Sequence, residues 1–250
     1  MQPATQQPTE SSSAIVEVAL REGRTALDEH EAKRLLAAYG VPVPAGGLAR
    51  SEAEALALAA SIDGAVALKA VGADIQHKTE SQLVLLDLRE PEKVAAAYGE
   101  LAERAGAALE AVLVEEMVAG TRELMVGMKR DAAFGPVVAF GLGGTMTEVF
   151  GDIALAIPPM DEREVEELLG RICSKQLRVE LRGRPVVDRR RLIDVVLAVA
   201  RIAEENPQIA EIDVSQLIIA GDRPVTTLDR MAWCGDHRRR HAAGCSDDHD

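Results

Sequence analysis

The segment VLVEEMVAGTRELMVGMKRDAAFGPVVAFGLG (residues 112–143) predicts three strands in succession. Apolar and β-branched residues dominate 112–118, 122–130 and 136–143, and the residues from Asp131 to Gly135 have the composition of a turn. This part of the chain is therefore predicted to be rich in β-structure, with the second and third strands joined by a short connection.

Helices and further strands are predicted on both sides of this segment. Asp28 with Glu31 has the pattern of a capping box that begins a helix, and Ser51 with Glu54 repeats it. The other predicted elements are helices from about Pro91, over about 161–170 and over 189–205, and strands over 65–70 and 82–88 and in the closing sequences EIDVSQLII and RPVTTLD. Helices and strands alternate without an internal repeat, which predicts an α+β (mixed α/β) fold in two unequal lobes.

The composition excludes several classes of protein. The 250 residues include 41 acidic and 28 basic ones, giving a formal net charge of −13, but only three phenylalanines, two tyrosines and one tryptophan. A nucleic-acid binder without sequence preference needs a basic groove and stacking rings, so we expect no nucleic-acid partner. No apolar stretch approaches the roughly 20 residues that span a bilayer, and three cysteines are too few for a disulfide framework. We therefore expect a cytoplasmic protein with an aliphatic core and no membrane partner.

Two strand segments carry residues that could contact a nucleotide. Lys69 lies within an apolar strand, where a phosphate partner would compensate for its desolvation; the alternative is a lysine that extends from a strand edge into water. Glu115 and Glu116 end another strand and are followed by Met117 and Val118. Because the chain has few rings, an adenine pocket here would consist of aliphatic side chains and backbone hydrogen bonds. A solvated acidic strand end is the alternative.

Two loops have residues that are typical of phosphate contacts. His77 is followed by Lys78, and a neutral imidazole can contact phosphate or accept a phosphoryl group, although an ordinary surface histidine fits the same pattern. The segment FGLGGT has closely spaced glycines whose N–H groups can bind an anion, or which form a structural turn. The residues of interest in and after this segment are Gly141, Gly143, Gly144 and Glu148.

Acidic residues of the two closing strands could hold a metal ion. Glu211 and Asp213 lie on one strand and Asp229 on the other, and carboxylates that face each other across a hairpin repel unless a cation bridges them. Mg²⁺ prefers such hard oxygen ligands together with substrate phosphates. The alternative is that these side chains point into solvent on opposite sides.

Taken together, these segments resemble the ATP-grasp domain of the ADP-forming (NDP-forming) acyl-CoA synthetases, and most closely the β-subunit type of the acetyl-CoA synthetases. The resemblance covers about residues 22–231, from EGRTALDEHEAKRLLAAYGVPVP through ALKAVGADIQHKT and VEEMVAGTRELMVGMKRDAAFGPVVAFGLGG to EIDV and TTLD. It implies two lobes, about 22–110 and 111–231, that clasp a nucleotide. The remaining residues, 1–21 and 232–250, are then tails, the first disordered or partly helical and the second disordered.

The resemblance also implies a role for each candidate residue. Lys69 would contact the nucleotide phosphates, the strand end from Glu115 to Val118 would hold adenine, and Glu123 would contact ribose or phosphate. His77 would relay a phosphoryl group between the phosphohistidine of a partner and the nucleotide, ATP or ADP. Magnesium would be held by Asp213, Ser215 and Asp229. The residues that face the phosphates and the partner would be Lys78, Gly141, Gly143, Gly144 and Glu148.

The implied reaction is acid + CoA + ATP ⇌ acyl-CoA + ADP + phosphate, through an acyl phosphate. Much of the CoA and acid chemistry of the family lies on an α subunit, so a CoA-binding partner is expected. Two departures from the family pattern leave an alternative. The family's H-K-S-D-V-G-G-V is replaced at 77–84 by HKTESQLV, and Ser215 replaces an asparagine of E-x-D-x-N-P. These changes allow a degenerate ATP-grasp scaffold without phosphoryl transfer, and a carboxylate–amine ligase on the same fold is a third reading.

Overall fold

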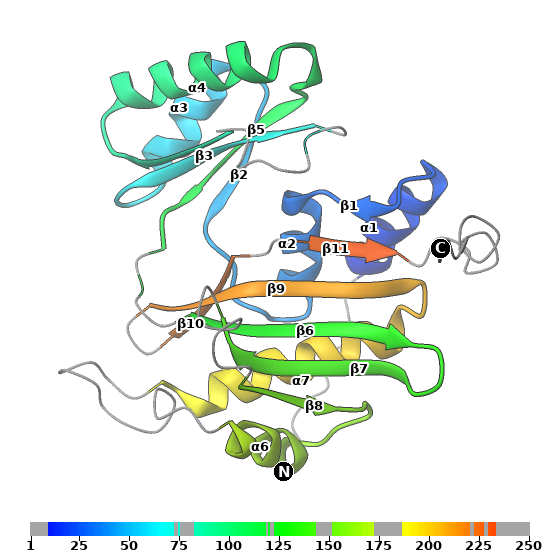
Figure 1. Cartoon of the computed structure of the whole chain (residues 1–250). Helices are drawn as coiled ribbons and strands as arrows, with labels where there is room; N and C mark the ends of the chain where they lie inside the picture. Colours follow the sequence, from blue (N-terminus) through cyan, green and yellow to red (C-terminus); the bar gives the residue numbers. More distant parts are fainter. Residues whose placement is uncertain are drawn as a thin grey trace, which may run out of the picture.

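Two antiparallel sheets form the framework of the molecule (Figure 1). This computed structural model describes residues 10–72, 75, 83–118, 120, 123–143, 152–172, 187–220, 223–227 and 230–233. Within these residues, the larger sheet has the strand order β1 (Ala26–Leu27), β11 (Arg230–Trp233), β9 (Ile209–Ala220), β6 (Glu123–Asp131), β7 (Gly135–Leu142) and β8 (Ile153–Ala156), with β10 (Arg223–Thr227) paired to β9. The smaller sheet has the order β2 (Gly46–Ala49), β5 (Ala111–Glu116), β3 (Val66–Val71) and β4 (Val84–Leu88).

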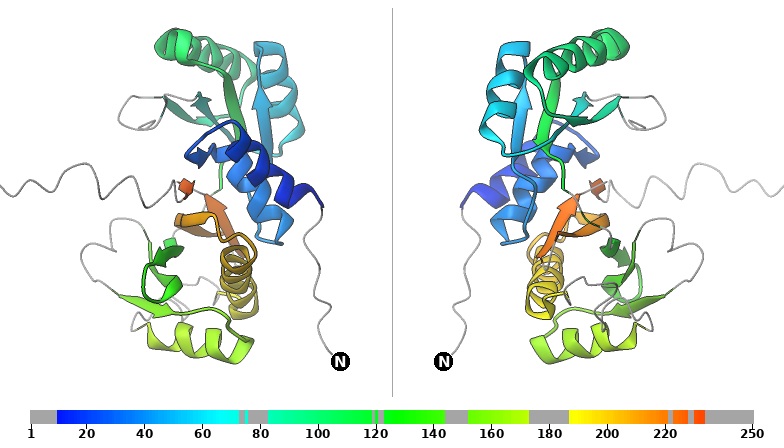
Figure 2. Two further views of the ribbon diagram at one scale, coloured as in Figure 1. Left: turned by 90° about the vertical axis from the view of Figure 1, so that its right-hand side faces the viewer. Right: turned by 90° about the vertical axis from the view of Figure 1, so that its left-hand side faces the viewer.

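The helices divide between the two sheets. The smaller sheet packs against α3 (Glu52–Ser61) and α4 (Pro91–Ala105), and α4 runs into the short 3-10 helix η1 (Gly106–Ala108). The larger sheet packs against α6 (Glu162–Arg171) and α7 (Arg189–Glu205), and α1 (Glu10–Arg21) and α2 (Glu29–Ala38) join the same core. Figure 2 shows the two lobes one above the other, with α1 and α2 at the level where they meet. None of the helices within the described residues combines the length and apolarity that crossing a bilayer requires.

The local signals at helix starts are confirmed. Asp28 and Glu31 form both bonds of a capping box: the Asp28 carboxylate accepts from the Glu31 N–H at 2.8 Å, and the Glu31 carboxylate accepts from the Asp28 N–H at 3.1 Å. At α3, the Ser51 hydroxyl accepts from the Glu54 N–H at 3.2 Å, but the Glu54 carboxylate accepts instead from the Arg50 N–H at 2.7 Å. The second helix therefore has the predicted cap without the reciprocal bond.

Each lobe has its own core, and both are aliphatic as the composition predicts. Among the described residues of the larger core, only Tyr39 and Phe140 are aromatic, and the smaller core is built from alanine, valine and leucine with Tyr98 packed at its side. This confirms the expected shortage of rings in the interior.

The sheets assign three segments differently from the lobe and tail limits expected from the sequence. Strand β5 pairs with β2 and β3, so residues 111–116 belong to the first sheet rather than opening the second lobe. The reason is that β5 is the centre of that sheet and hydrogen-bonds on both sides. Strand β1 pairs with β11, which brings residues 26–27 and 230–233 into the larger sheet. Helix α1 contributes Ile15 and Val16 to the larger core.

Candidate nucleotide and metal site

Strand alternation sends Lys69 and Glu115 to one face of the smaller sheet. Residues 66, 68 and 70 of β3 and 112 and 114 of β5 lie in the core under α3 and α4. Because side chains alternate along a strand, Lys69 and Glu115 belong to the opposite face. The pairing register places Lys69 opposite Leu113, so Glu115 is its diagonal neighbour on the adjacent strand.

Lys69 is largely enclosed and lies between two carboxylates. Its ammonium nitrogen lies 2.7 Å from a Glu29 oxygen and 2.5 Å from a Glu115 oxygen, and 17% of its side chain is exposed. Burial alone would lower the pKa of Lys69, but the charges and hydrogen bonds of the two carboxylates outweigh it and raise the pKa above its usual value. Lys69 is therefore held in its charged form, and its side chain does not extend into water as a strand-edge lysine would.

The strand end from Glu115 to Val118 separates into a buried and an open part. Glu115 is buried, with both carboxylate oxygens on lysines, whereas Glu116 and Met117 are exposed. The N–H groups of Glu116 and Met117 donate to Ala45 and Ala65 carbonyls at 2.7 and 2.9 Å. Within the described residues, the Met117 carbonyl and the Val118 N–H accept and donate no backbone hydrogen bond. A carbonyl and an N–H that pair with no described backbone group thus follow one another at the connection between the lobes.

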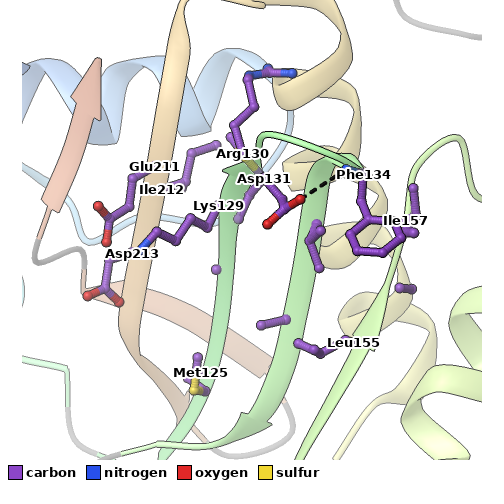
Figure 3. A pocket seen from close by; sticks show the side chains of 15 residues that line it. Met125, Lys129, Arg130, Asp131, Phe134, Leu155, Ile157, Glu211, Ile212 and Asp213 are labelled. Atoms are coloured by element: carbon purple, nitrogen blue, oxygen red, sulfur yellow. Dashed lines mark hydrogen bonds between the residues drawn. The ribbon is translucent and has the colours of Figure 1, made fainter. Parts of the chain in front are cut away.

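The face of the larger sheet opposite α7 contains a cavity of about 690 Å³ (Figure 3). Met125, Gly127, Lys129 and Asp131 alternate along β6 and line it, together with residues of β7, β8 and β9. Apolar side chains form one wall, and charged side chains form the other. The apolar wall comprises Phe134, Val137, Ala139, Leu155 and Ile157, and the charged wall Lys129, Asp131, Glu211 and Asp213.

Asp213 and Glu211 lie on β9 at two positions that share the cavity. Lys129 pairs with Glu211 across β6 and β9, and Figure 3 shows its side chain directed toward Asp213. Two carboxylates with a cavity beside them fit the hard oxygen ligands that Mg²⁺ requires. Ser215 also belongs to β9, but its side chain lies outside those that the structure describes, as does Asp229. The described residues contain no group of three or more His, Cys, Asp or Glu side chains that could hold a metal ion by themselves.

The described glycines of FGLGGT are packed within the sheet. Gly141 pairs with Met125 on one side and Ile153 on the other, and a Cβ added there would lie 2.6 Å from the Asp152 carbonyl oxygen. The Gly143 N–H donates to the Glu123 carbonyl at 2.9 Å, which closes the start of β6 onto the end of β7. Close strand approach therefore explains Gly141, and its phosphate contact stays a prediction.

The sequence-predicted residues fall into separate groups. Lys69 and Glu115 meet each other, Asp213 lines the cavity of the larger sheet, and Lys69 does not line that cavity. The predicted sites that lie outside the described residues are His77, Lys78, Gly144, Glu148 and Asp229.

Three charged residues of these clusters were not predicted from the sequence. Glu29 and Lys33, one helical turn apart on α2, contact Lys69 and Glu115, but the local sequence indicates only that they lie on a helix. Lys129 could have been found from its alternation with Met125 and Gly127 along a predicted strand.

Comparison with known proteins identifies the family. A model of the ATP-grasp domain matches residues 18–232. The chain belongs to the ATP-grasp domain family. The β subunit of ADP-forming acetate–CoA ligase II from Pyrococcus furiosus is 32% identical over 211 residues, which cover 82% of this chain and 89% of that subunit. The resemblance and the ATP-grasp fold inferred from the sequence are confirmed.

Solved structures agree with this assignment. The dinucleotide-forming acetyl-CoA synthetase 1 of Ca. Korarchaeum cryptofilum, in complex with CoA, Ca-AMPCP and HgCl⁺, superposes with a TM-score of 0.84 at 34% identity, over 89% of this chain and 99% of that one. Another structure of that enzyme, with CoA and Mg-AMPPCP, has a TM-score of 0.79 at 32% identity over the same shares. The ADP-forming acetate–CoA ligase I of Archaeoglobus fulgidus is 35% identical over 82% of this chain, but only 30% of that longer protein is covered.

Proposed function

We propose that this chain is the nucleotide-binding β subunit of an ADP-forming acyl-CoA synthetase, which catalyses acid + CoA + ATP ⇌ acyl-CoA + ADP + phosphate. The observation that carries the proposal is the match to a separate β subunit over 82% of this chain, which has a largely enclosed lysine on the smaller sheet and a cavity lined with carboxylates on the larger one. The longer relatives, of which this chain covers about 30%, support the need for a partner that supplies CoA binding.

The strand connection between the lobes is the proposed adenine site. The Met117 carbonyl can accept from the adenine amino group, and the Val118 N–H can donate to the neighbouring ring nitrogen. Met117, which is 39% exposed, supplies an aliphatic surface for the ring. Lys69 then contacts the phosphates, and Glu123, exposed at the start of β6, contacts ribose or phosphate. Glu115 and Glu116 complete the proposed nucleotide-binding strand. Glu115 acts indirectly, through its contact with Lys69.

Magnesium is the proposed metal, held by Asp213 with Ser215 and Asp229. The oxygen donors of Asp213 and Glu211 fit a hard divalent cation, and Lys129 beside them limits their mutual repulsion. When bound, the ion neutralises phosphate charge. The ion and Lys69 are needed because a chain with a net charge of −13 otherwise repels a nucleotide.

Phosphoryl transfer is proposed to involve His77, with Lys78, Gly141, Gly143, Gly144 and Glu148 on the side that faces phosphate and partner. The transfer passes from a phosphohistidine of the partner through His77 to ADP, and in reverse from ATP. The proposed partner is a CoA-binding α subunit, and the proposed location is the cytoplasm.

Titration calorimetry of the full chain with Mg·ADP and Mg·ATP tests the nucleotide site. The wild-type chain is expected to bind both, and Lys69→Met to weaken binding by at least about tenfold, since a charge-assisted hydrogen bond to phosphate is lost. Lys93→Met is the matched control, because Lys93 lies on α4 with 63% of its side chain exposed and forms a surface ion pair with Glu90. Absence of both heat and a thermal shift with the wild-type chain would overturn the proposal.

The alternative function, a degenerate ATP-grasp scaffold, is motivated by Ser215 in place of an asparagine and by the loss of two glycines after His77. A partner identified by pull-down and mass spectrometry allows the complex to be reconstituted and acyl-CoA formation to be measured. Loss of turnover in His77→Ala supports the relay, whereas unchanged turnover favours the scaffold.

A further inference from the structure

Four charged side chains, each no more than 17% exposed, form a closed ring between the lobes, here called the ionic ring: Glu29, Lys33, Lys69 and Glu115. The Lys33 ammonium lies 2.8 Å from Glu29 and also contacts Glu115, while Lys69 lies 2.7 Å from Glu29 and 2.5 Å from Glu115. Each lysine therefore bridges both carboxylates, and each carboxylate accepts from both lysines. The ring carries no net charge.

The ring joins elements that belong to different cores. Glu29 and Lys33 lie on α2, whose Leu35 and Leu36 are buried in the core of the larger lobe. Lys69 and Glu115 lie on the central strands of the smaller sheet. The ring is thus an ionic contact across the junction of the lobes.

The four side chains are not equally enclosed. The exposed fractions are 9% for Glu29, 6% for Lys33 and 5% for Glu115, against 17% for Lys69. Lys69 is therefore the member that can turn toward a ligand. When it does so, Glu29 and Glu115 keep Lys33 as a shared cation, and without Lys33 the buried Glu115 carboxylate would lose the second of its two lysine partners, which is a costly state.

We propose that Lys33 is a positioning residue for nucleotide binding: by neutralising Glu29 and Glu115, it leaves Lys69 free to move from these carboxylates to the nucleotide phosphates. This inference rests on the proposed function, since it requires a nucleotide beside Lys69. On this proposal, the charge of the ring controls the affinity for ADP and ATP, and Lys33 itself does not contact the nucleotide.

The test compares Mg·ADP dissociation constants of variants that change the ring charge in opposite directions. Lys33→Met gives the ring a charge of −1, so Lys69 is held more tightly and the dissociation constant rises by about tenfold, equivalent to about 1.4 kcal/mol. Glu29→Gln gives a charge of +1 and lowers the constant severalfold. The double variant is neutral and returns toward the wild-type value, and Lys33→Arg keeps the charge and the affinity. Thermal unfolding without nucleotide is recorded for each.

The outcomes separate this inference from the proposed function. A wild-type chain that binds no Mg·ADP refutes the proposed function. A wild-type chain that binds, with Lys33→Met equally tight or the double variant as weak as Lys33→Met, overturns the role of Lys33, even if both variants unfold at lower temperature. If Lys33→Met does not fold, Glu29→Gln decides: tighter binding supports the proposal, and unchanged or weaker binding overturns it.

Discussion

Replacing Tyr39 by phenylalanine tests how α2 is anchored to the larger lobe. Tyr39 follows α2, and its hydroxyl donates to the Glu205 carboxylate at 2.7 Å and accepts from the Asn206 amide at 3.1 Å, at the end of α7. The substitution removes both hydrogen bonds, although Asn206 still donates to the Ile202 carbonyl at 2.9 Å. Loss of one charge-assisted bond and one neutral bond should lower the free energy of unfolding by about 1–2 kcal/mol at pH 8.

The same residue gives the protein a calculable sensitivity to alkali. Burial, followed by the hydrogen bond to Glu205, raises the pKa of Tyr39 from 10.0 to about 12. The folded state therefore favours the neutral phenol, so this contribution is fully present below pH 10 and is lost as the pH rises to about 12. A shift of this size corresponds to about 3 kcal/mol. The stability difference between wild type and Tyr39→Phe should thus shrink to zero or reverse by pH 11.5.

Urea denaturation followed by far-UV circular dichroism at pH values from 8 to 11.5 measures this difference directly. Other titrating groups are common to both proteins and cancel in the difference. Tyr98→Phe, which removes the phenol packed beside the smaller core, is the matched control for loss of a tyrosine. A wild-type advantage that stays constant across this pH range would show that the folded state does not hold Tyr39 as a neutral phenol, and the reasoning would fail.

Three further predictions concern the larger sheet. Asp213→Asn should weaken Mg·ADP binding by at least about tenfold, because a ligand of the metal is lost. The binding of metal-free ADP, measured by the same calorimetry in EDTA, should change little. Gly141→Ala should lower the free energy of unfolding by about 1–3 kcal/mol in urea, because its Cβ would lie 2.6 Å from the Asp152 carbonyl oxygen; a stability equal to wild type would contradict that packing. Arg130→Met should lower the free energy of unfolding by about 1–3 kcal/mol, since the Arg130 guanidinium donates to the Ala203 carbonyl at 2.7 Å near the end of α7. An unchanged free energy of unfolding in the same urea titration would contradict this prediction.

Local patterns predicted the helices from α2 to α7 and the longer strands, but not the short strands β1, β2, β8 and β11. The capping box at Asp28 and Glu31 needs only neighbouring residues, and α2 begins there. The predicted helices at 161–170 and 189–205 correspond to α6 and α7, and the closing hairpin corresponds to the β9 and β10 pair. Each of these features depends on residues that are close together in the sequence, so it can be predicted from the local pattern.

Sheet assignment could not be read in the same way. Strand β5 follows α4 and precedes β6 in the chain, and its apolar run is equally compatible with either sheet. What decides its place is hydrogen bonding to β2 and β3, which lie 40 or more residues earlier. The β1–β11 pair, which joins residues 26–27 to 231–232, is longer in range still. A lobe limit drawn from sequence order alone therefore differs from the limit that strand pairing sets.

Lys69 shows the same limit at the level of chemistry. A lysine in an apolar strand requires either a counter-charge or an exit to water, and the sequence left both open. The choice between a phosphate and a carboxylate could not be made, because Glu29 lies 40 residues earlier and reaches Lys69 only after α2 packs on the larger lobe. The two carboxylate partners of Lys69 are compatible with a phosphate site. A cation that already has partners in the protein can change partners without ever being left unpaired, whereas a buried lysine that waited alone for nucleotide would be driven to lose its proton.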